Sequence, residues 1–241
     1  METNKIHNMD CLEGLKQMED NSVDLIVTDP PYGIDYQSAR RTESERFEKI
    51  ENDDIPKTVF LKDCFKLLKE ESAIYLFTRW DVYPLWLKSM KEVGFIIKNC
   101  IVWDRMVHGL GDLTGSYAPQ HDFIIFATKG RHILKNGRPK DIMKVKRPDV
   151  DKMIHPTEKP TALIRQLIKN SSNKEDLVLD PFMGSGSTAK SCVELERNYI
   201  GFELSEKYCK VANKRLAQKG VTDFFAQKVR EQKTEEANNG N

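Results

Sequence analysis

The stretch Val23–Tyr32 limits most strongly what this chain can fold into. It begins as an apolar, β-branched run, which is typical of a buried strand, and it ends at Asp29, two prolines and Tyr32. Because proline has a fixed φ and no backbone N–H, the strand cannot continue past Pro30 and Pro31, and the carbonyl groups there are left free. A carboxylate, a carbonyl and an aromatic ring are therefore expected together at a rigid strand end, where they can hold a planar amino group.

The predicted elements around this strand alternate between strands and helices. Apolar periodicity predicts further strands over 5–9, 72–78, 95–103, 122–128, 177–180 and 199–202. It predicts helices over 11–18, 58–68, 85–93, 189–195 and 206–217, and one that Thr157 caps and that has Pro160 in its first turn. This alternation is typical of a doubly wound α/β sheet, so we expect one catalytic domain over 1–226 and a polar, disordered tail over 227–241.

Charge and cysteine content exclude several classes of protein. The formal net charge of the 241 residues is +1, so a nucleic acid would have to be held by a local basic patch. The five cysteines are scattered and form no CxxC pair, which favours reduced thiols in a cytoplasmic protein over a disulfide framework or a zinc site. The sequence has no signal-peptide pattern and no apolar run long enough to cross a bilayer, so we expect no membrane partner and no metal.

A second motif lies between two predicted strands near the end of the chain. Asp180-Pro181-Phe182 leads into a glycine turn that contains Gly184, Gly186 and Ser187, and Glu203 ends the following strand. This layout is typical of nucleoside binding, because the glycines allow close approach of the backbone and the acid can accept both ribose hydroxyls. The glycines alone also fit a relaxed dinucleotide pattern, which leaves an NAD-binding enzyme open, whereas a P-loop is excluded because no lysine follows Gly186.

The two motifs together resemble those of the amino-group DNA methyltransferases. Asp29-Pro30-Pro31-Tyr32 resembles their catalytic Asp-Pro-Pro-Tyr, and Asp180-Pro181-Phe182 before the glycines resembles the element that holds S-adenosylmethionine. Their order, catalytic motif first and cofactor glycines last, resembles the beta group of adenine-N6 enzymes. The resemblance implies a Rossmann-like fold with a circularly permuted motif order, a seven-stranded, mainly parallel sheet with helices on both faces, and methyl transfer to a flipped-out adenine in DNA.

The resemblance also implies roles for individual residues. The catalytic set is Asp29, Pro30, Pro31 and Tyr32: Asp29 and the Pro30 carbonyl accept the N–H bonds of the target amine, and Tyr32 stacks on the base. Asp10 would meet the cofactor adenine, Glu203 the ribose, and the glycine motif the methionine end, while the segment that ends in Lys159 and Pro160 resembles an element beside the cofactor. The whole set expected to hold S-adenosylmethionine is Asp10, Asp29, Lys159, Pro160, Asp180, Phe182, Gly184, Gly186, Ser187 and Glu203.

Two basic segments are candidates for contact with double-stranded DNA: a loop over 33–54, expected to be mobile, and the irregular stretch 129–152. Each could equally be a solvated surface segment. The side chains expected to contact DNA are Arg40, Arg41, Arg131, Lys135, Arg138, Lys140, Lys144, Lys146 and Arg147. The resemblance further implies a homodimer and the possibility of a cognate restriction endonuclease, although 129–152 is short for a recognition domain of this family.

Several alternatives to adenine methylation stay open from the sequence. The first motif could be an ordinary strand end with Tyr32 as surface packing. Related cytosine-N4 enzymes use the same chemistry but more often have Ser at the position of Asp29, and enzymes that modify RNA or protein amides more often have Asn. A non-catalytic DNA-binding subunit of the same fold is a further alternative, against which the intact Asp29, Tyr32, Gly184 and Gly186 argue.

Overall fold

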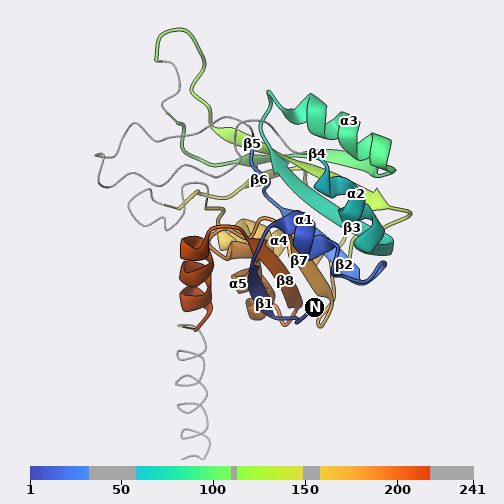
Figure 1. Ribbon diagram of the computed structural model, residues 1–241. Coiled ribbons are helices and arrows are strands. Elements are labelled where there is room, and N and C mark those ends of the chain that lie inside the picture. Colours follow the sequence, from blue (N-terminus) through green and yellow to red (C-terminus); the bar gives the residue numbers. More distant parts are fainter. Residues whose placement is uncertain (33–57, 110–112, 149–157, 218–241) are drawn as a thin grey trace, which may run out of the picture.

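The computed structural model describes residues 1–32, 58–109, 113–148 and 158–217 (Figure 1). The loop expected over 33–54, with Arg40 and Arg41, lies outside the described residues, and so do Thr157 and the tail over 227–241. Within the described part, no helix is both long and apolar enough to cross a bilayer. No group of three or more His, Cys, Asp or Glu side chains that could hold a metal ion is found among these residues either.

The described strands form one sheet in the order β1-β8-β7-β2-β3-β5-β4-β6 (Figure 1). β5 is antiparallel to both of its neighbours, and all the other pairings are parallel. The bounds are β1 Lys5–Asn8, β2 Val23–Thr28, β3 Leu68–Thr78, β4 Ile96–Asp104, β5 His121–Lys129, β6 Ile142–Lys144, β7 Leu177–Asp180 and β8 Asn198–Glu203. The α/β fold expected from the alternating elements is confirmed.

The expected number of strands is wrong by one, because the described residues contain eight strands instead of seven. The additional strand, β6, is three residues long and lies in the basic stretch that was expected to be irregular. It pairs in parallel with the end of β4, from Val102 to Asp104. A strand this short carries too few residues to produce a readable alternation, so its position is fixed by pairing with β4.

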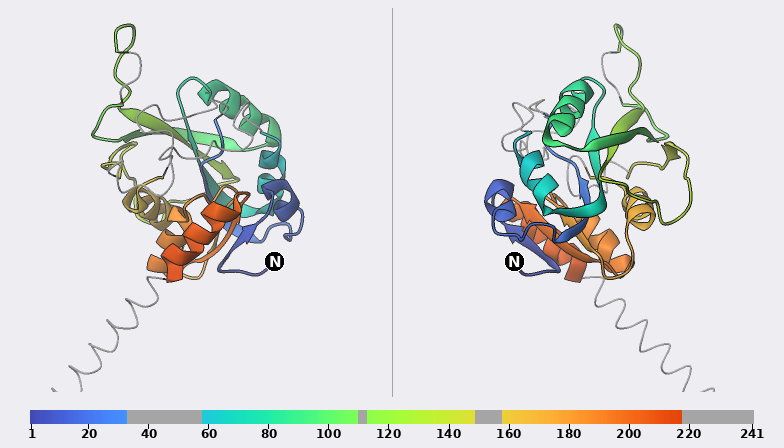
Figure 2. Two further views of the ribbon diagram at one scale, coloured as in Figure 1. Left: turned by 60° about the vertical axis from the view of Figure 1, so that its left-hand side comes forward. Right: turned by 90° about the vertical axis from the view of Figure 1, so that its right-hand side faces the viewer.

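Helices cover both faces of the sheet (Figure 2). One face packs against α4 (Thr161–Ser171), α5 (Ser187–Glu194) and the helix over 206–217, and the other packs against α1 (Cys11–Leu15), α2 (Phe60–Leu67) and α3 (Tyr83–Val93). Side chains of β3 alternate between the two cores: Tyr75 and Phe77 belong to the first, and Ile74 and Leu76 to the second. Burial on both faces explains why β2 and β3 read as nearly continuous apolar runs.

Two helix ends show how local sequence sets the element bounds. Gly94 ends α3 in the left-handed region at a φ of 117°, where its N–H bonds the carbonyls of Met90 and Lys91, as the sequence predicts. The start of α4 differs from the prediction: Pro160 is the N-cap itself and makes no side-chain capping bond. Pro160 has an extended conformation there, so it marks the point at which the chain enters the helix.

The close packing of α1 on β8 generates a test of the fold. A Cβ atom added to Gly14 would lie 2.3 Å from the buried ring of Phe202. We expect Gly14→Ala to lower the free energy of unfolding by about 1–3 kcal/mol, because neither the helix nor the ring has room to move. Urea unfolding measures the loss, and adding Phe202→Leu should recover part of it. Equal unfolding midpoints for Gly14→Ala and the wild type would contradict this packing.

Candidate active site at the carboxyl edge of the sheet

Four neighbouring strands place an acid at the same edge of the sheet (Figure 1). Asp180 and Glu203 are the last residues of β7 and β8, Asp29 follows β2 directly, and Asp10 comes two residues after β1. Because β1, β8, β7 and β2 are parallel and adjacent, these four residues follow one another along the carboxyl edge. Ligands of open α/β sheets bind outside this edge, so the expected catalytic and cofactor acids occur where a ligand site should be.

Asp29 is held by two side chains, one near in sequence and one distant. The Tyr32 hydroxyl donates to Oδ1 of Asp29, and the Lys159 ammonium forms an ion pair with Oδ2. Lys159 Nζ also lies 3.4 Å from the Tyr32 hydroxyl oxygen. The Lys159 side chain is 9% exposed and that of Asp29 is 18% exposed, so the ion pair is largely shielded from solvent. The sequence places Lys159 beside the cofactor, but it gives no signal for this contact with Asp29.

The environment of Tyr32 keeps its hydroxyl protonated. Burial raises the pKa of Tyr32 well above its ordinary value, and the charges of Asp29 and Asp122 raise it further. The hydrogen bond to Asp29 acts in the same direction, while Arg79 opposes it weakly. Tyr32 can therefore act as a hydrogen-bond donor to the carboxylate over the whole physiological pH range.

Asp180 is a buried acid that fastens the turn after β7. One of its oxygens accepts from the Thr188 hydroxyl at 2.6 Å and the other from the Phe182 N–H at 3.1 Å. Burial raises the pKa of Asp180 to about 7, although the bonds from Thr188 and Phe182 oppose that shift, and the charge of Asp29 raises it further. A cation bound nearby would favour the charged carboxylate and so lower this pKa.

The glycine turn and Glu203 are connected directly. The Gly184 N–H donates to Oε2 of Glu203 at 2.8 Å, while Oε1 accepts from the Ser205 N–H at the same distance. Gly184 has a φ of 53° and Gly186 a φ of 79°, in the left-handed region that glycine adopts most readily. A carboxylate offers about four acceptor positions, so Glu203 can still accept bonds from ligand hydroxyls.

The two glycines nevertheless differ in what surrounds them. A Cβ atom on Gly186 would lie 3.0 Å from the Cβ atom of Ala212 on the helix over 206–217, so helix packing already requires glycine there. Asp10 accepts from the Leu12 N–H at 2.7 Å and thereby caps α1. The ring of Phe182 packs edge-on against Phe60, with centroids 4.9 Å apart. Each of these residues therefore has a structural contact besides its expected place in a ligand site.

Arg215 is a residue of this region that the sequence analysis missed. Its guanidinium pairs with Glu158 at 2.7 Å and lies 3.4 Å from the hydroxyl of Ser187. It also donates to the carbonyl of Ser185 at 3.2 Å. Arg215 thus ties the glycine turn to the segment that carries Lys159. A single arginine in a polar helix gives no local signal of such a role.

The basic stretch expected to contact DNA is divided between two edges of the sheet. Arg131 and Lys135 lie at the opposite, amino edge, where the chain leaves the end of β5 and the Lys135 N–H bonds Asn170 near the end of α4. Lys144, Lys146 and Arg147 instead lie at the carboxyl edge, where the Arg147 N–H bonds the carbonyl of Arg105 just after β4. Only the second group is on the same side of the sheet as Asp29.

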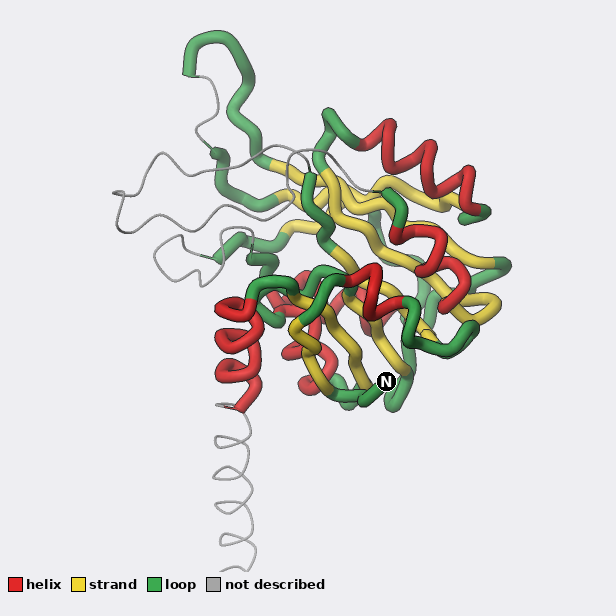
Figure 3. Tube along the Cα trace, viewed as in Figure 1, coloured by secondary structure: helices red, strands yellow, loops and turns green. Residues whose placement is uncertain are grey.

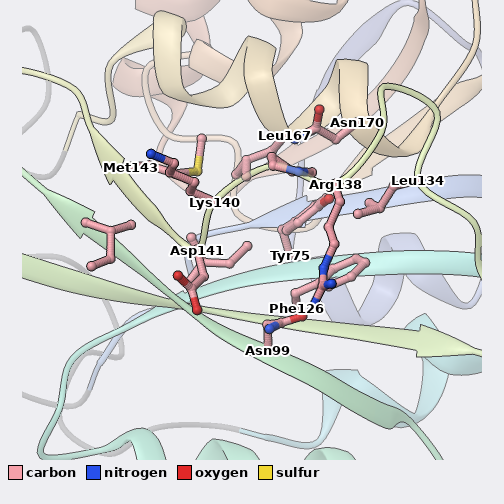
Figure 4. Close-up of a pocket in the computed structure, with 13 residues that line it drawn as sticks. Tyr75, Asn99, Phe126, Leu134, Arg138, Lys140, Asp141, Met143, Leu167 and Asn170 are labelled. Carbon is pink, nitrogen blue, oxygen red and sulfur yellow. The ribbon is translucent and has the colours of Figure 1, made fainter.

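Arg138 and Lys140 lie between these two groups. They line a pocket of about 510 Å³ together with Tyr75 and Phe126 of the sheet and Leu167 of α4 (Figure 4). Tyr75 and Phe126 stack there with ring centroids 4.8 Å apart. The pocket therefore opens on a face of the sheet and is not part of the carboxyl edge.

The connection between β4 and β5 projects from the carboxyl edge, as the tube in Figure 3 shows. Its described residues include the exposed side chains of Met106, Leu113 and Tyr117, and Trp80 after β3 is exposed as well. Arg105 anchors the base of this connection by donating to the carbonyl of Pro119 at 2.6 Å. The sequence predicts a loop here but gives no indication that it would stand beside the candidate site.

Comparison with known proteins decides the family. The model of a DNA methylase family, N6_N4_Mtase, matches residues 23–214. The chain belongs to this family. It is 29% identical to the type II methyltransferase M.HpaI of Haemophilus parainfluenzae over 86% of this chain and 72% of that protein. It is also 29% identical to M1.MboII of Moraxella bovis over 88% of this chain and 96% of that protein.

Solved structures agree with the fold of this DNA methylase. The M1.HpyAVI–SAM complex has a TM-score of 0.67 at 26% identity, over 88% of this chain and 98% of that one. The cytosine-N4-specific PvuII DNA methyltransferase has a TM-score of 0.66 over 87% of this chain and 86% of that one. Its identity is 17%, so this second likeness concerns the fold alone.

Asp180 gives a test of the site's electrostatics. Its pKa is raised from 3.8 to about 7 on folding, so the native protein binds a proton that the unfolded chain releases between these values. We expect the contribution of Asp180 to the free energy of unfolding to be present below about pH 4 and to be lost as the pH rises through about 7. Urea unfolding at pH 5 and pH 8 should show a smaller decline for Asp180→Asn than for the wild type, and parallel declines would contradict this assignment.

Proposed function

We propose that this DNA methylase transfers a methyl group from S-adenosylmethionine to the N6 amino group of an adenine flipped out of duplex DNA. The observation that carries the proposal is the arrangement at Asp29: a carboxylate at the end of a central strand, followed by Pro30, Pro31 and Tyr32, with the Tyr32 hydroxyl bonded to it. Membership in the family supports the reaction class, and the presence of Asp at position 29 favours adenine.

The chemistry requires acceptors that are in place before the base arrives. An exocyclic amino group is a poor nucleophile because its lone pair is delocalised into the ring. Acceptance of its two N–H bonds by Asp29 and by the Pro30 carbonyl favours a pyramidal nitrogen and directs the lone pair toward the methyl donor. Asp29 is already oriented by Tyr32 and Lys159, so little reorganisation is needed during the reaction. The methylated amine then loses a proton.

The proposed cofactor fits the residues of the carboxyl edge. S-adenosylmethionine supplies an electrophilic methyl group on a sulfonium. Glu203 retains acceptor capacity for ribose hydroxyls, Gly184 has a conformation that keeps side-chain atoms out of the turn, and the acid of Asp180 can face a cation. The related M1.HpyAVI structure is a complex with SAM, which supports the same ligand here.

Cytosine-N4 methylation is the second candidate. The family model covers both N6 and N4 enzymes, and the PvuII enzyme with the same fold is specific for cytosine N4. The acceptor arrangement at Asp29 serves either amino group, so the base is identified by product analysis. The proposed assembly is a homodimer, and a cognate restriction endonuclease is its proposed functional partner, in line with the type II relatives.

The first functional test removes the carboxylate. We expect Asp29→Ala to lower the single-turnover rate of methyl transfer by about 100- to 1,000-fold, because one preorganised acceptor contributes roughly 3–4 kcal/mol in the transition state. Affinity for S-adenosylmethionine should change little. Tritiated cofactor with nucleoside analysis of the DNA measures both the rate and the base. Asp63→Ala on α2, distant from the carboxyl edge, is the matched control.

The outcomes separate the parts of the proposal. Label on N6-methyladenine supports it, and label on cytosine replaces adenine with the second candidate while retaining the mechanism. An Asp29→Ala protein that transfers methyl at the wild-type rate would refute the mechanism. Tight binding of NAD in place of S-adenosylmethionine, measured by calorimetry, would refute the assignment of the cofactor.

The division of the basic stretch gives a second test. We propose that Lys144, Lys146 and Arg147, which follow β6 to the carboxyl edge, contact DNA phosphates. Changing all three to Glu should weaken DNA binding and reduce the slope of log affinity against log salt by up to about three contacts at 0.9 each. Fluorescence anisotropy over a range of salt concentrations measures this slope. The matched control is Arg131→Glu with Lys135→Glu at the opposite edge, and an equal change in slope for the control would refute the proposed DNA face.

A further inference from the structure

Lys159 occupies the part of the site where the target amino group should bind. Its ammonium is one of the few charged groups that the described residues bury almost completely, at 9% exposure. It meets Oδ2 of Asp29 as an ion pair and lies 3.4 Å from the Tyr32 hydroxyl oxygen. It also lies over two aromatic rings, 5.7 Å from the centroid of Tyr32 and 5.2 Å from that of Phe77. These are contacts with the catalytic motif.

The occupancy of the two carboxylate oxygens has a consequence for the reaction. Oδ1 accepts from Tyr32, and Oδ2 accepts from Lys159. An entering amino group is a nitrogen donor with the same requirement as the ammonium, so one of the existing donors has to give way. The Tyr32 hydroxyl is confined by its own short loop, three residues from Asp29, whereas the lysine stem has four rotatable methylenes. The ammonium is therefore the donor that can move.

We propose that Lys159 is a positioning residue for Asp29 whose place at Oδ2 is taken over by the target amino group. This inference rests on the proposed function. In the protein without DNA, the ammonium holds the carboxylate in the orientation that the amine will need. When the base enters, the ammonium moves toward the faces of Tyr32 and Phe77, where cation–π attraction offsets the lost ion pair.

The fold fixes the stem of Lys159 firmly enough for this role. Lys159 is the residue before Pro160, the N-cap of α4, and that helix is anchored in the core by Leu163 and Leu167. Proline restricts the conformation of the residue that precedes it, so the backbone of Lys159 is constrained on its C-terminal side. The mobility that the proposal requires is therefore confined to the side chain.

The test is a double-mutant cycle between Lys159→Met and Asp29→Ala. Methionine keeps an unbranched apolar stem between the two rings but has no N–H donor, so it removes the ion pair with little change in packing. In the wild-type background, we expect Lys159→Met to lower kcat by about 100-fold, the typical cost of a misplaced catalytic group. The KM for DNA should stay equal or fall, because the competitor of the amino group is gone. In the Asp29→Ala background, Lys159→Met should have almost no further effect on the rate.

Other roles for Lys159 give different results. A ligand of the cofactor would make S-adenosylmethionine bind more weakly after Lys159→Met in both backgrounds, and a structural residue would multiply the losses of the two changes and raise the KM. Either result would overturn the inference. Thermal unfolding of the four proteins supplies a readout that needs no activity: the loss of midpoint caused by Lys159→Met should be larger with Asp29 present, and equal losses in the two backgrounds would overturn the ion pair.

The inference and the proposed function can fail separately. A wild-type protein that transfers no methyl group to adenine or cytosine in DNA would refute both. An active wild type with independent effects of Lys159→Met and Asp29→Ala would refute the positioning role alone and would leave methyl transfer standing.

Discussion

The site depends on the parallel pairing of β2 with β7. Leu25 and Ile26 pair with Val178 and Leu179, residues that are about 150 positions away in the chain. This pairing brings the end of the first motif next to the start of the second, so that Asp29 and Asp180 emerge at the same edge and each affects the electrostatics of the other. Neither motif could form a methyl-transfer site by itself, because one would supply the acceptors for the base and the other the turn for the cofactor.

The charges at the carboxyl edge suit two of the expected ligands better than the third. Asp10, Glu203, Asp180 and Asp29 attract a sulfonium and accept bonds from hydroxyl and amino groups, but they repel phosphate. Phosphate contacts therefore have to come from the periphery of the site, where Lys144, Lys146 and Arg147 lie at the end of β6. A net charge of only +1 for the whole chain is compatible with DNA binding if the basic groups are concentrated in this way.

Much of the fold could be predicted from the sequence because the signals are local. The strand at 23–28 is bounded by the prolines that follow it, and α3 ends at Gly94 as expected. Interactions between segments distant in sequence were not predictable. β6 exists only through its pairing with β4, the basic stretch reverses direction twice before its second half reaches the site, and Lys159 meets Asp29 across 130 positions. Composition shows that a stretch is basic, but only the path of the chain shows which edge each side chain reaches.

The position of β1 at the end of the sheet affects how the protein can be made. β1 pairs with β8, the last strand, and the N–H of Asn4 just before it bonds the carbonyl of Tyr199. A ribosome releases β1 and β2 early, but their partners β8 and β7 are synthesised near the end. The half of the sheet that carries Asp10, Asp180 and Glu203 can therefore assemble only after nearly all of the chain has emerged. An incompletely translated chain lacks the strands that complete the cofactor site, which would prevent nascent fragments from modifying DNA.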